Sequence, residues 1–221
     1  WSTDTLSVCY STGKGVLATL AHIMVSAGLL DYDTPVRHYW PEFAQNGKAE
    51  MTLRHILSHQ TGLYDIRNMI QSAVEMADWS HMLQVMEQAT PRFAVGQDIA
   101  YQALTFGWLV GGVLEKATGQ SLQDLMQQYL VEPLALVGAY FGVPQDQLNR
   151  VARLLPKEKA PKQQVAQSMQ QATHNKVKKH HKVSFSDKLV ELSGQNPQDF
   201  LDAMVPKGMK DFSFFSDQGL Q

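Results

Sequence analysis

The chain has a single cysteine among its 221 residues and almost no excess of charge of either sign. Without a second cysteine, Cys9 cannot form an internal disulfide, so no oxidising compartment is indicated. Lys and Arg number 19 against 21 Asp and Glu, and this balance supplies no field that would attract nucleic acid or membrane phosphates. No run of about 18 uncharged apolar residues is present. We therefore expect no nucleic-acid partner and no membrane span, with the cytoplasm as the favoured compartment and the oligomeric state left open.

The start of the chain has neither an initiator methionine nor an apolar signal core. It reads Trp1-Ser2-Thr3-Asp4, and we expect it to be a piece of a longer protein. Hydrophobic residues make up 44% of the sequence, which is enough to bury a core.

Apolar residues at three- and four-residue steps predict a series of helices. Gly28 and Gly119 stand where a left-handed residue would end a helix, and Thr52 and Ser121 stand where a side chain would cap the start of one. The expected elements are a short strand or extended entry over 5–10, helices over 16–27, 52–58, 67–90, 104–117 and 122–130, and a loop over 31–40.

The character of the sequence changes in the segment 157–188, which is rich in Gln and Lys. Eight lysines face only Glu158 and Asp187 there, a net charge of +6. Few apolar residues anchor this segment, which favours a solvated helix or a mobile insertion over a basic interaction patch. His180 and His181 have no spaced carboxylate or second histidine pair beside them, so we expect no metal site.

Ser11 and Lys14 form a Ser-x-x-Lys tetrad between the extended entry and the first long apolar run. Residues three apart on a helix share one face, so the hydroxyl and the amine can touch. A serine hydroxyl is a weak nucleophile until a neighbouring base takes its proton, and an amine can do so. The start of a helix also favours the negative charge that builds on an attacked carbonyl. The alternative is a polar helix start with an exposed lysine.

Further strings follow the tetrad in a fixed order. They occupy 28–36, 51–63, 101–108, 115–121 and 132–136. Together with the tetrad they resemble the serine β-lactamase-like superfamily, in the branch of the class C β-lactamases and the family VIII carboxylesterases. The resemblance covers about residues 1–156, and the string 205–209 is similar to a segment that precedes the last strands of such esterases.

The resemblance implies a role for each of three residues. Ser11 would be the acylated nucleophile, Lys14 the group that activates it, and Tyr101 the tyrosine of the second family motif, which shuttles protons and protonates the leaving group. Lys14 and Tyr101 would titrate as a unit, so the identity of the base stays open. No metal or organic cofactor is implied.

Three departures from the family pattern bear on activity. The second motif reads Tyr101-Gln102-Ala103 instead of Tyr-x-Asn, which favours an esterase over a β-lactamase. No Lys-Thr-Gly, His-x-Gly or Trp-x-Gly is present, although that third motif completes the oxyanion hole in the family. The opening strands of the family would lie before Trp1. We therefore expect an incomplete sheet and weak or no turnover by the 221 residues alone.

The fold expected is α+β and β-lactamase/transpeptidase-like, an antiparallel sheet flanked by helices with a mainly helical region. Residues 1–30 would give the nucleophile strand and helix, 31–150 the helical region, and 151–221 the basic insertion and the return to the core. The function expected is a serine hydrolase that forms an acyl-enzyme on a small ester or amide, foremost a carboxylesterase on short-chain esters. The alternatives are a class C-like β-lactamase or D-alanyl peptidase, and a non-catalytic binding or scaffolding relative.

Other polar residues receive structural interpretations. Cys9 is expected to be buried in the entry strand and inert. His55 is interpreted as a surface or packing histidine. His59 and Thr61-Gly62 resemble the family string that supports the loop under the site and are expected to be mainly structural.

Overall fold

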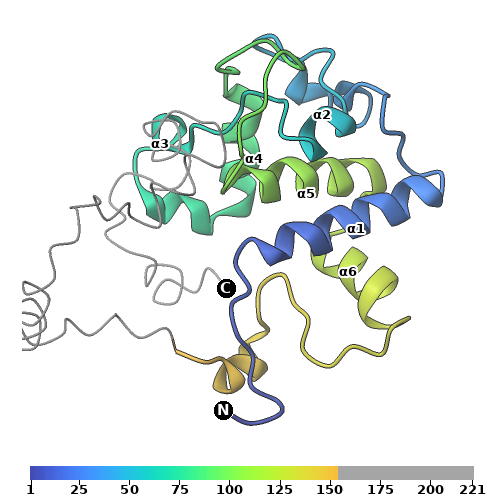
Figure 1. Ribbon diagram of the computed structural model, residues 1–221, viewed down its shortest axis with the longest axis vertical. Helices are drawn as coiled ribbons and strands as arrows, with labels where there is room; N and C mark the ends of the chain where they lie inside the picture. Colours follow the sequence, from blue (N-terminus) through green and yellow to red (C-terminus); the bar gives the residue numbers. More distant parts are fainter. Residues whose placement is uncertain (154–221) are drawn as a thin grey trace, which may run out of the picture.

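The computed structural model describes residues 1–153, which fold as helices joined by ordered loops (Figure 1). The α-helices are α1 (Thr12–Ser26), α2 (Leu53–Leu57), α3 (Ile66–Met69), α4 (Trp79–Gln88), α5 (Thr105–Thr118) and α6 (Leu122–Met126). Short 3₁₀ helices span Val36–His38, Pro41–Ala44, Ala73–Ala77 and Gln145–Arg150, and a π-helical turn, Gln127–Val131, continues α6.

Helix α5 is the centre of the packing, with α1, α2 and α4 against it (Figure 1) and α6 also in contact with it. Its residues are apolar on nearly every side, as expected of a helix surrounded by others. Gly111 and Gly112 let neighbouring tryptophans approach closely, since a Cβ atom at Gly112 would lie 2.6 Å from the ring of Trp40. Trp40 and Phe43 are fully buried and pack on each other with ring centres 4.9 Å apart.

Several helix ends have the predicted chemistry. Gly28 has φ +73° and donates to Val25 O, while the next N–H, that of Leu29, donates to Met24 O. This pair of bonds is the Schellman arrangement that closes α1. Gly119 ends α5 with φ +70°, and the Ser121 hydroxyl caps α6 by accepting from the N–H of Asp124.

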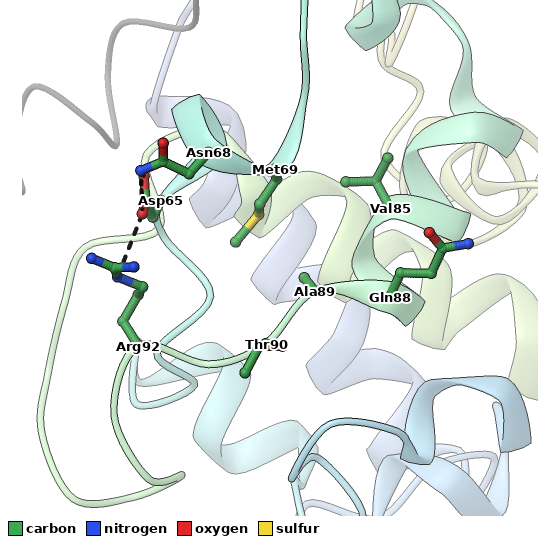
Figure 2. Close-up of a pocket in the computed structure, with 8 residues that line it drawn as sticks. All are labelled: Asp65, Asn68, Met69, Val85, Gln88, Ala89, Thr90 and Arg92. Atoms are coloured by element: carbon green, nitrogen blue, oxygen red, sulfur yellow. Dashed lines mark hydrogen bonds and ion pairs between the residues drawn. The ribbon is translucent and has the colours of Figure 1, made fainter.

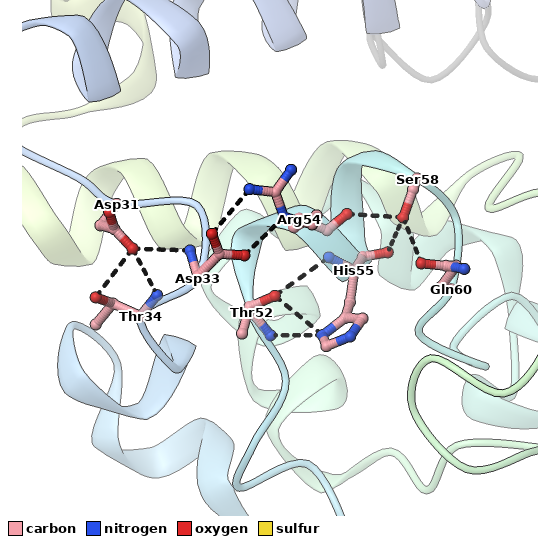
Figure 3. Close-up of polar contacts among 8 residues, drawn as sticks. All are labelled: Asp31, Asp33, Thr34, Thr52, Arg54, His55, Ser58 and Gln60. Carbon is pink, nitrogen blue, oxygen red and sulfur yellow. Dashed lines mark hydrogen bonds and ion pairs between the residues drawn. The ribbon is translucent and has the colours of Figure 1, made fainter.

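Polar contacts fix the first turn of the short helix α2 (Figure 3). The Thr52 hydroxyl accepts from the N–H of His55, and Nδ1 of His55 accepts from the N–H of Thr52, which makes a reciprocal cap. Arg54 binds both carboxylate oxygens of Asp33 at 2.6 and 2.8 Å. His55, which was predicted to be a surface or packing residue, therefore has a specific capping role.

The structure differs from the predicted elements over 67–90. The helical stretch expected over 67–90 is divided into α3, a 3₁₀ turn and α4, because Ser72 and Asp78 are extended and each caps a new start. Of the two alternatives expected over 5–10, a short strand and an extended entry, the structure has the extended entry, with one isolated parallel bridge between Leu6 and Val151.

Sheet formation within residues 1–153 is limited to isolated bridges, that at Leu6 and an antiparallel one between Pro35 and Thr52. The antiparallel sheet expected from the sequence is therefore not seen in this part of the chain. The basic segment 157–188, the pair His180-His181 and the string 205–209 lie outside the described residues.

Candidate active site

Ser11 is an exposed residue that directly precedes α1, at the N-cap position. Its backbone is already helical, with φ −66° and ψ −9°, and its side chain makes no capping bond to the helix. The preceding residue, Tyr10, has φ +45°, a left-handed conformation that turns the extended entry sharply into the helix. The N–H groups of Thr12, Gly13 and Lys14 bond back to Cys9, Tyr10 and Ser11, so this turn does not use the N–H of Ser11.

Lys14 lies one turn further along α1, and its amine reaches two oxygens. Nζ donates to Ser11 Oγ at 3.2 Å and to the carbonyl oxygen of Ala103 at 2.6 Å. The second bond fixes the amine in place from the other half of the structure, at the segment that leads into α5. Lys14 is half-buried, so the amine is held against the serine and does not extend into bulk water.

Tyr101 comes from that same segment and lies over the amine. Lys14 Nζ is 5.1 Å from the centre of its ring, within the range of a cation–π contact. The structure therefore brings the three predicted site residues, Ser11, Lys14 and Tyr101, to one place. Two of them come from the start of α1 and the third from the turn before α5.

The loop 59–63 lies behind Tyr101 and holds the segment 100–103. The Thr61 hydroxyl donates to Oε1 of the buried Gln102 at 3.1 Å and accepts from the N–H of Leu63. The N–H of Ala100 donates to the carbonyl oxygen of His59 at 3.0 Å. This string was predicted to be mainly structural, and its contacts show that what it supports is the backbone on either side of Tyr101.

His59 makes the most direct of these contacts. Its Nδ1 accepts from the N–H of Gln102 at 3.3 Å, and its ring meets that of Tyr101 edge-on with centres 5.0 Å apart. Burial lowers the pKa of His59 below its ordinary value of 6.5, and the charge of Lys14 lowers it further, while a side-chain hydrogen bond with Gln102 acts in the opposite direction. His59 was predicted only as a structural residue of the loop under the site, and nothing in the sequence indicated the carbonyl of Ala103.

The prediction that Cys9 is buried in a strand is wrong. Its side chain is exposed and its thiol donates weakly to the carbonyl oxygen of Ser7 at 3.4 Å. The cause is the absence of strand partners around this stretch in the described part of the chain, which leaves alternate side chains of the entry open to solvent.

An apolar hollow of about 560 Å³ lies along the entry and α1, and none of Ser11, Lys14 and Tyr101 lines it. One wall is the entry and the start of α1, including Tyr10 and Val16, and the other runs from Met126 to Val143. The lining of this hollow is mainly apolar and includes no charged side chain.

A second hollow of about 290 Å³ lies between the α3 region and the end of α4 (Figure 2). The buried carboxylate of Asp65 accepts two bonds from the amide of Asn68, at 2.8 and 3.0 Å, and pairs with Arg92 at 3.4 Å. The polar groups at this hollow therefore bind one another. It contains none of the three predicted site residues.

Metal ligands do not gather in the part of the chain that is described, where no three His, Cys, Asp or Glu side chains come together. The helices there are also too short or too polar to cross a bilayer.

Comparison with known proteins gives a consistent set of relatives. Residues 1–211 match a family model described as Beta-lactamase. The esterase/beta-lactamase LipL of Mycobacterium tuberculosis is 34% identical over 208 residues, which are 93% of this chain and 47% of LipL. Esterase EstB of Burkholderia gladioli is 29% identical over 150 residues, which are 60% of this chain and 38% of EstB.

Solved structures give the same picture. A family VIII carboxylesterase has a TM-score of 0.67 and 35% identity, covering 71% of this chain and 43% of its own. A penicillin-binding protein homolog from Caulobacter crescentus has a TM-score of 0.66 and 32% identity, covering 73% of this chain and 43% of its own. The chain spans less than half the length of each of these four proteins.

Proposed function

Because the chain belongs to the beta-lactamase family and shares the β-lactamase/transpeptidase fold of its structural neighbours, we propose that the protein containing it is a serine hydrolase that is acylated at Ser11. The observation that carries the proposal is the bond from Lys14 Nζ to Ser11 Oγ, on a serine that is exposed and not used as a helix cap. A nucleophile and its activating group within hydrogen-bond reach are what this chemistry requires.

In the proposed reaction Ser11 Oγ attacks the carbonyl carbon of the substrate. The Lys14–Tyr101 pair takes the hydroxyl proton and returns it to the leaving alcohol or amine as the bond to the acyl group breaks. The Ser11 N–H donates to the oxyanion, since the first turn of α1 leaves it unused. Water then attacks the acyl-serine ester. The same pair passes one of its protons to Ser11 Oγ as the bond to the acyl group breaks, and the acid is released.

Carboxylic esters with a short acyl group are the proposed substrates. Position 103 is Ala, so the motif carries no side-chain amide that could hold the amide group of a β-lactam. What residue 103 contributes is its backbone carbonyl, which binds Lys14. Among the relatives, EstB is named an esterase and LipL an esterase/beta-lactamase.

The test is labelling with a fluorophosphonate followed by peptide mass spectrometry. We expect an adduct on Ser11 in the natural full-length protein and none in Ser11→Ala. A folded protein with no label on Ser11 would contradict the proposal and favour a non-catalytic binding role.

Substrate choice is tested by comparing p-nitrophenyl acetate with the cephalosporin nitrocefin. We expect the larger kcat/KM on the ester. Equal or greater kcat/KM on nitrocefin would assign the protein to the β-lactamases instead.

A further inference from the structure

We propose that His59 is a positioning residue for this site, because it fixes the backbone that carries both Tyr101 and the Ala103 carbonyl. The inference rests on the proposed function for its catalytic consequence, although its structural part is independent of it. His59 touches neither Ser11 nor any reacting atom by a bond in the structure, so it would act through the segment 101–103.

The imidazole of His59 contacts both the turn 101–103 and the start of α5. Its Nδ1 accepts from the N–H of Gln102, the residue between Tyr101 and Ala103. Its ring lies edge-on to Tyr101, and it packs on Phe106 of α5 with ring centres 5.2 Å apart. The hydrogen bond holds the turn at its middle residue, Gln102, and one ring contact holds Tyr101. The residues on either side of Gln102, Tyr101 and Ala103, both contact Lys14.

This role requires a neutral imidazole. Nδ1 accepts a hydrogen bond only when it carries no proton, whereas both nitrogens donate in the imidazolium. The groups that face the ring are the Lys14 amine from α1, the Tyr101 phenol and the Gln102 amide from the segment before α5, and the uncharged Phe106. The nearby positive charge and the burial both oppose a second charge on His59.

The backbone of His59 offers a discriminating pair of substitutions. Its φ is +60°, a left-handed value that Asn tolerates far better than Ala does. Asn also carries a side-chain oxygen that can accept from the N–H of Gln102, so His59→Asn keeps the bond and loses the ring. His59→Ala loses both. His38→Asn is the matched control, because His38 is exposed and its ring also lies edge-on to a tyrosine, Tyr39, with centres 5.3 Å apart.

The experiment measures two quantities in the natural full-length protein and its variants. One is the rate of fluorophosphonate labelling of Ser11, and the other is hydrogen exchange of the Gln102 amide. For His59→Ala we expect labelling to slow by about 10- to 100-fold, the scale of a small misplacement of catalytic groups, with faster exchange at Gln102. We expect His59→Asn to restore most of both, and His38→Asn to change neither.

The pH dependence supplies a further readout that needs no variant. Because the pKa of His59 is lowered in the folded protein, its protonation favours opening of the Gln102 bond. We expect protection of the Gln102 amide to fall as the pH decreases below about 6.5, and this fall to vanish in His59→Asn.

The outcomes separate the two proposals. Labelling of His59→Ala at the wild-type rate, or an Asn variant no better than the Ala variant, would overturn the positioning role. If the wild-type protein is not labelled at all, the proposed function fails, and the Gln102 exchange rates still decide whether His59 holds this backbone. If His59→Ala does not fold, the Asn variant and the wild-type pH profile of exchange carry the test.

Discussion

The amine of Lys14 lies 2.6 Å from the carbonyl oxygen of Ala103, a residue 89 positions further along the chain. This bond joins the start of α1 to the turn before α5, and it directs the amine toward Ser11. A lysine that was only exposed on the first turn of a helix would have no such acceptor. The relationship makes the position of the amine a property of the tertiary fold, and it leads to the first prediction.

Replacing Lys14 by Met keeps the length of the side chain and removes the amine. We expect the rate of Ser11 labelling and kcat on p-nitrophenyl acetate to fall by about 10²- to 10⁴-fold, the usual contribution of a general base, with the melting temperature little changed. Lys116→Met is the control, since Lys116 is a partly exposed lysine on α5. Equal losses in the two variants would contradict the assignment of Lys14.

Replacing Tyr101 by Phe removes the phenolic hydroxyl and keeps the ring over Lys14 and against His59. We expect kcat to fall by about 10²- to 10⁴-fold, while KM and the thermal unfolding midpoint stay close to wild type. Tyr129→Phe, at a tyrosine packed on the core away from the site, should leave kcat unchanged. A Tyr101→Phe enzyme with wild-type kcat would assign the proton transfers to Lys14 alone.

Two glycines of α5 should respond oppositely to alanine. At Gly112 a Cβ atom would lie 2.6 Å from the ring of Trp40 and 2.9 Å from Leu83, so we expect Gly112→Ala to lower the free energy of unfolding by about 1–3 kcal/mol. At Gly107 nothing lies within 4 Å of a Cβ atom, and Ala favours a helix by up to about 1 kcal/mol over Gly. Urea denaturation of both variants would measure the difference. A Gly112→Ala protein as stable as Gly107→Ala would contradict the close approach of Trp40 to Gly112.

The burial of Lys48 should make the free energy of unfolding depend on pH in the alkaline range. It is fully buried, and its Nζ donates to the carbonyl oxygens of Glu87 and Ala89 at the end of α4. Burial lowers its pKa from 10.5 to about 8, against the charge of Glu87, which raises it. Between these two pH values the unfolded chain binds the proton and the folded chain releases it, so the free energy of unfolding should rise with pH, by no more than about 3 kcal/mol.

Urea denaturation at pH 7.5 and at pH 10 measures this rise, and Lys48→Met should abolish it. At pH 7.5 the same variant leaves two partly buried carbonyls without the Lys48 donor, which should cost about 1–3 kcal/mol. Lys116→Met again serves as the control, with the wild-type dependence on pH. A Lys48→Met protein that keeps the full alkaline rise would show that another group causes it.

Much of the helical framework follows from the sequence alone. Gly28, Gly119, Thr52 and Ser121 each end or begin a helix as predicted, because caps depend on chemistry within one turn of chain. The elements within 67–90 were harder to predict, because the methionines there are spaced compatibly with one helix. The caps at Ser72 and Asp78 divide that stretch. Local pattern fixes that such a stretch is helical, and the competition between adjacent caps decides where it breaks.

The candidate site shows the same limit more sharply. The proximity of Ser11 and Lys14 follows from their spacing of three, and the resemblance supplied Tyr101. Neither the spacing nor the resemblance reveals that the Ala103 carbonyl accepts a hydrogen bond from Lys14, or that His59 accepts one from Gln102. Both contacts join segments more than 40 positions apart. The predicted burial of Cys9 was wrong for a related reason. Burial there depends on strand partners, which the local alternation of residues does not specify.

The bridge between Leu6 and Val151 has a consequence for local unfolding of the described region. It joins the two ends of the described region through the bonds from Leu6 N–H to Arg150 O and from Ala152 N–H to Leu6 O. Nearly the whole intervening chain must be ordered before this pairing closes, so it carries a large entropic cost and is held by few contacts. Within the described region, local unfolding should therefore begin at this pairing and extend along the entry toward Ser11.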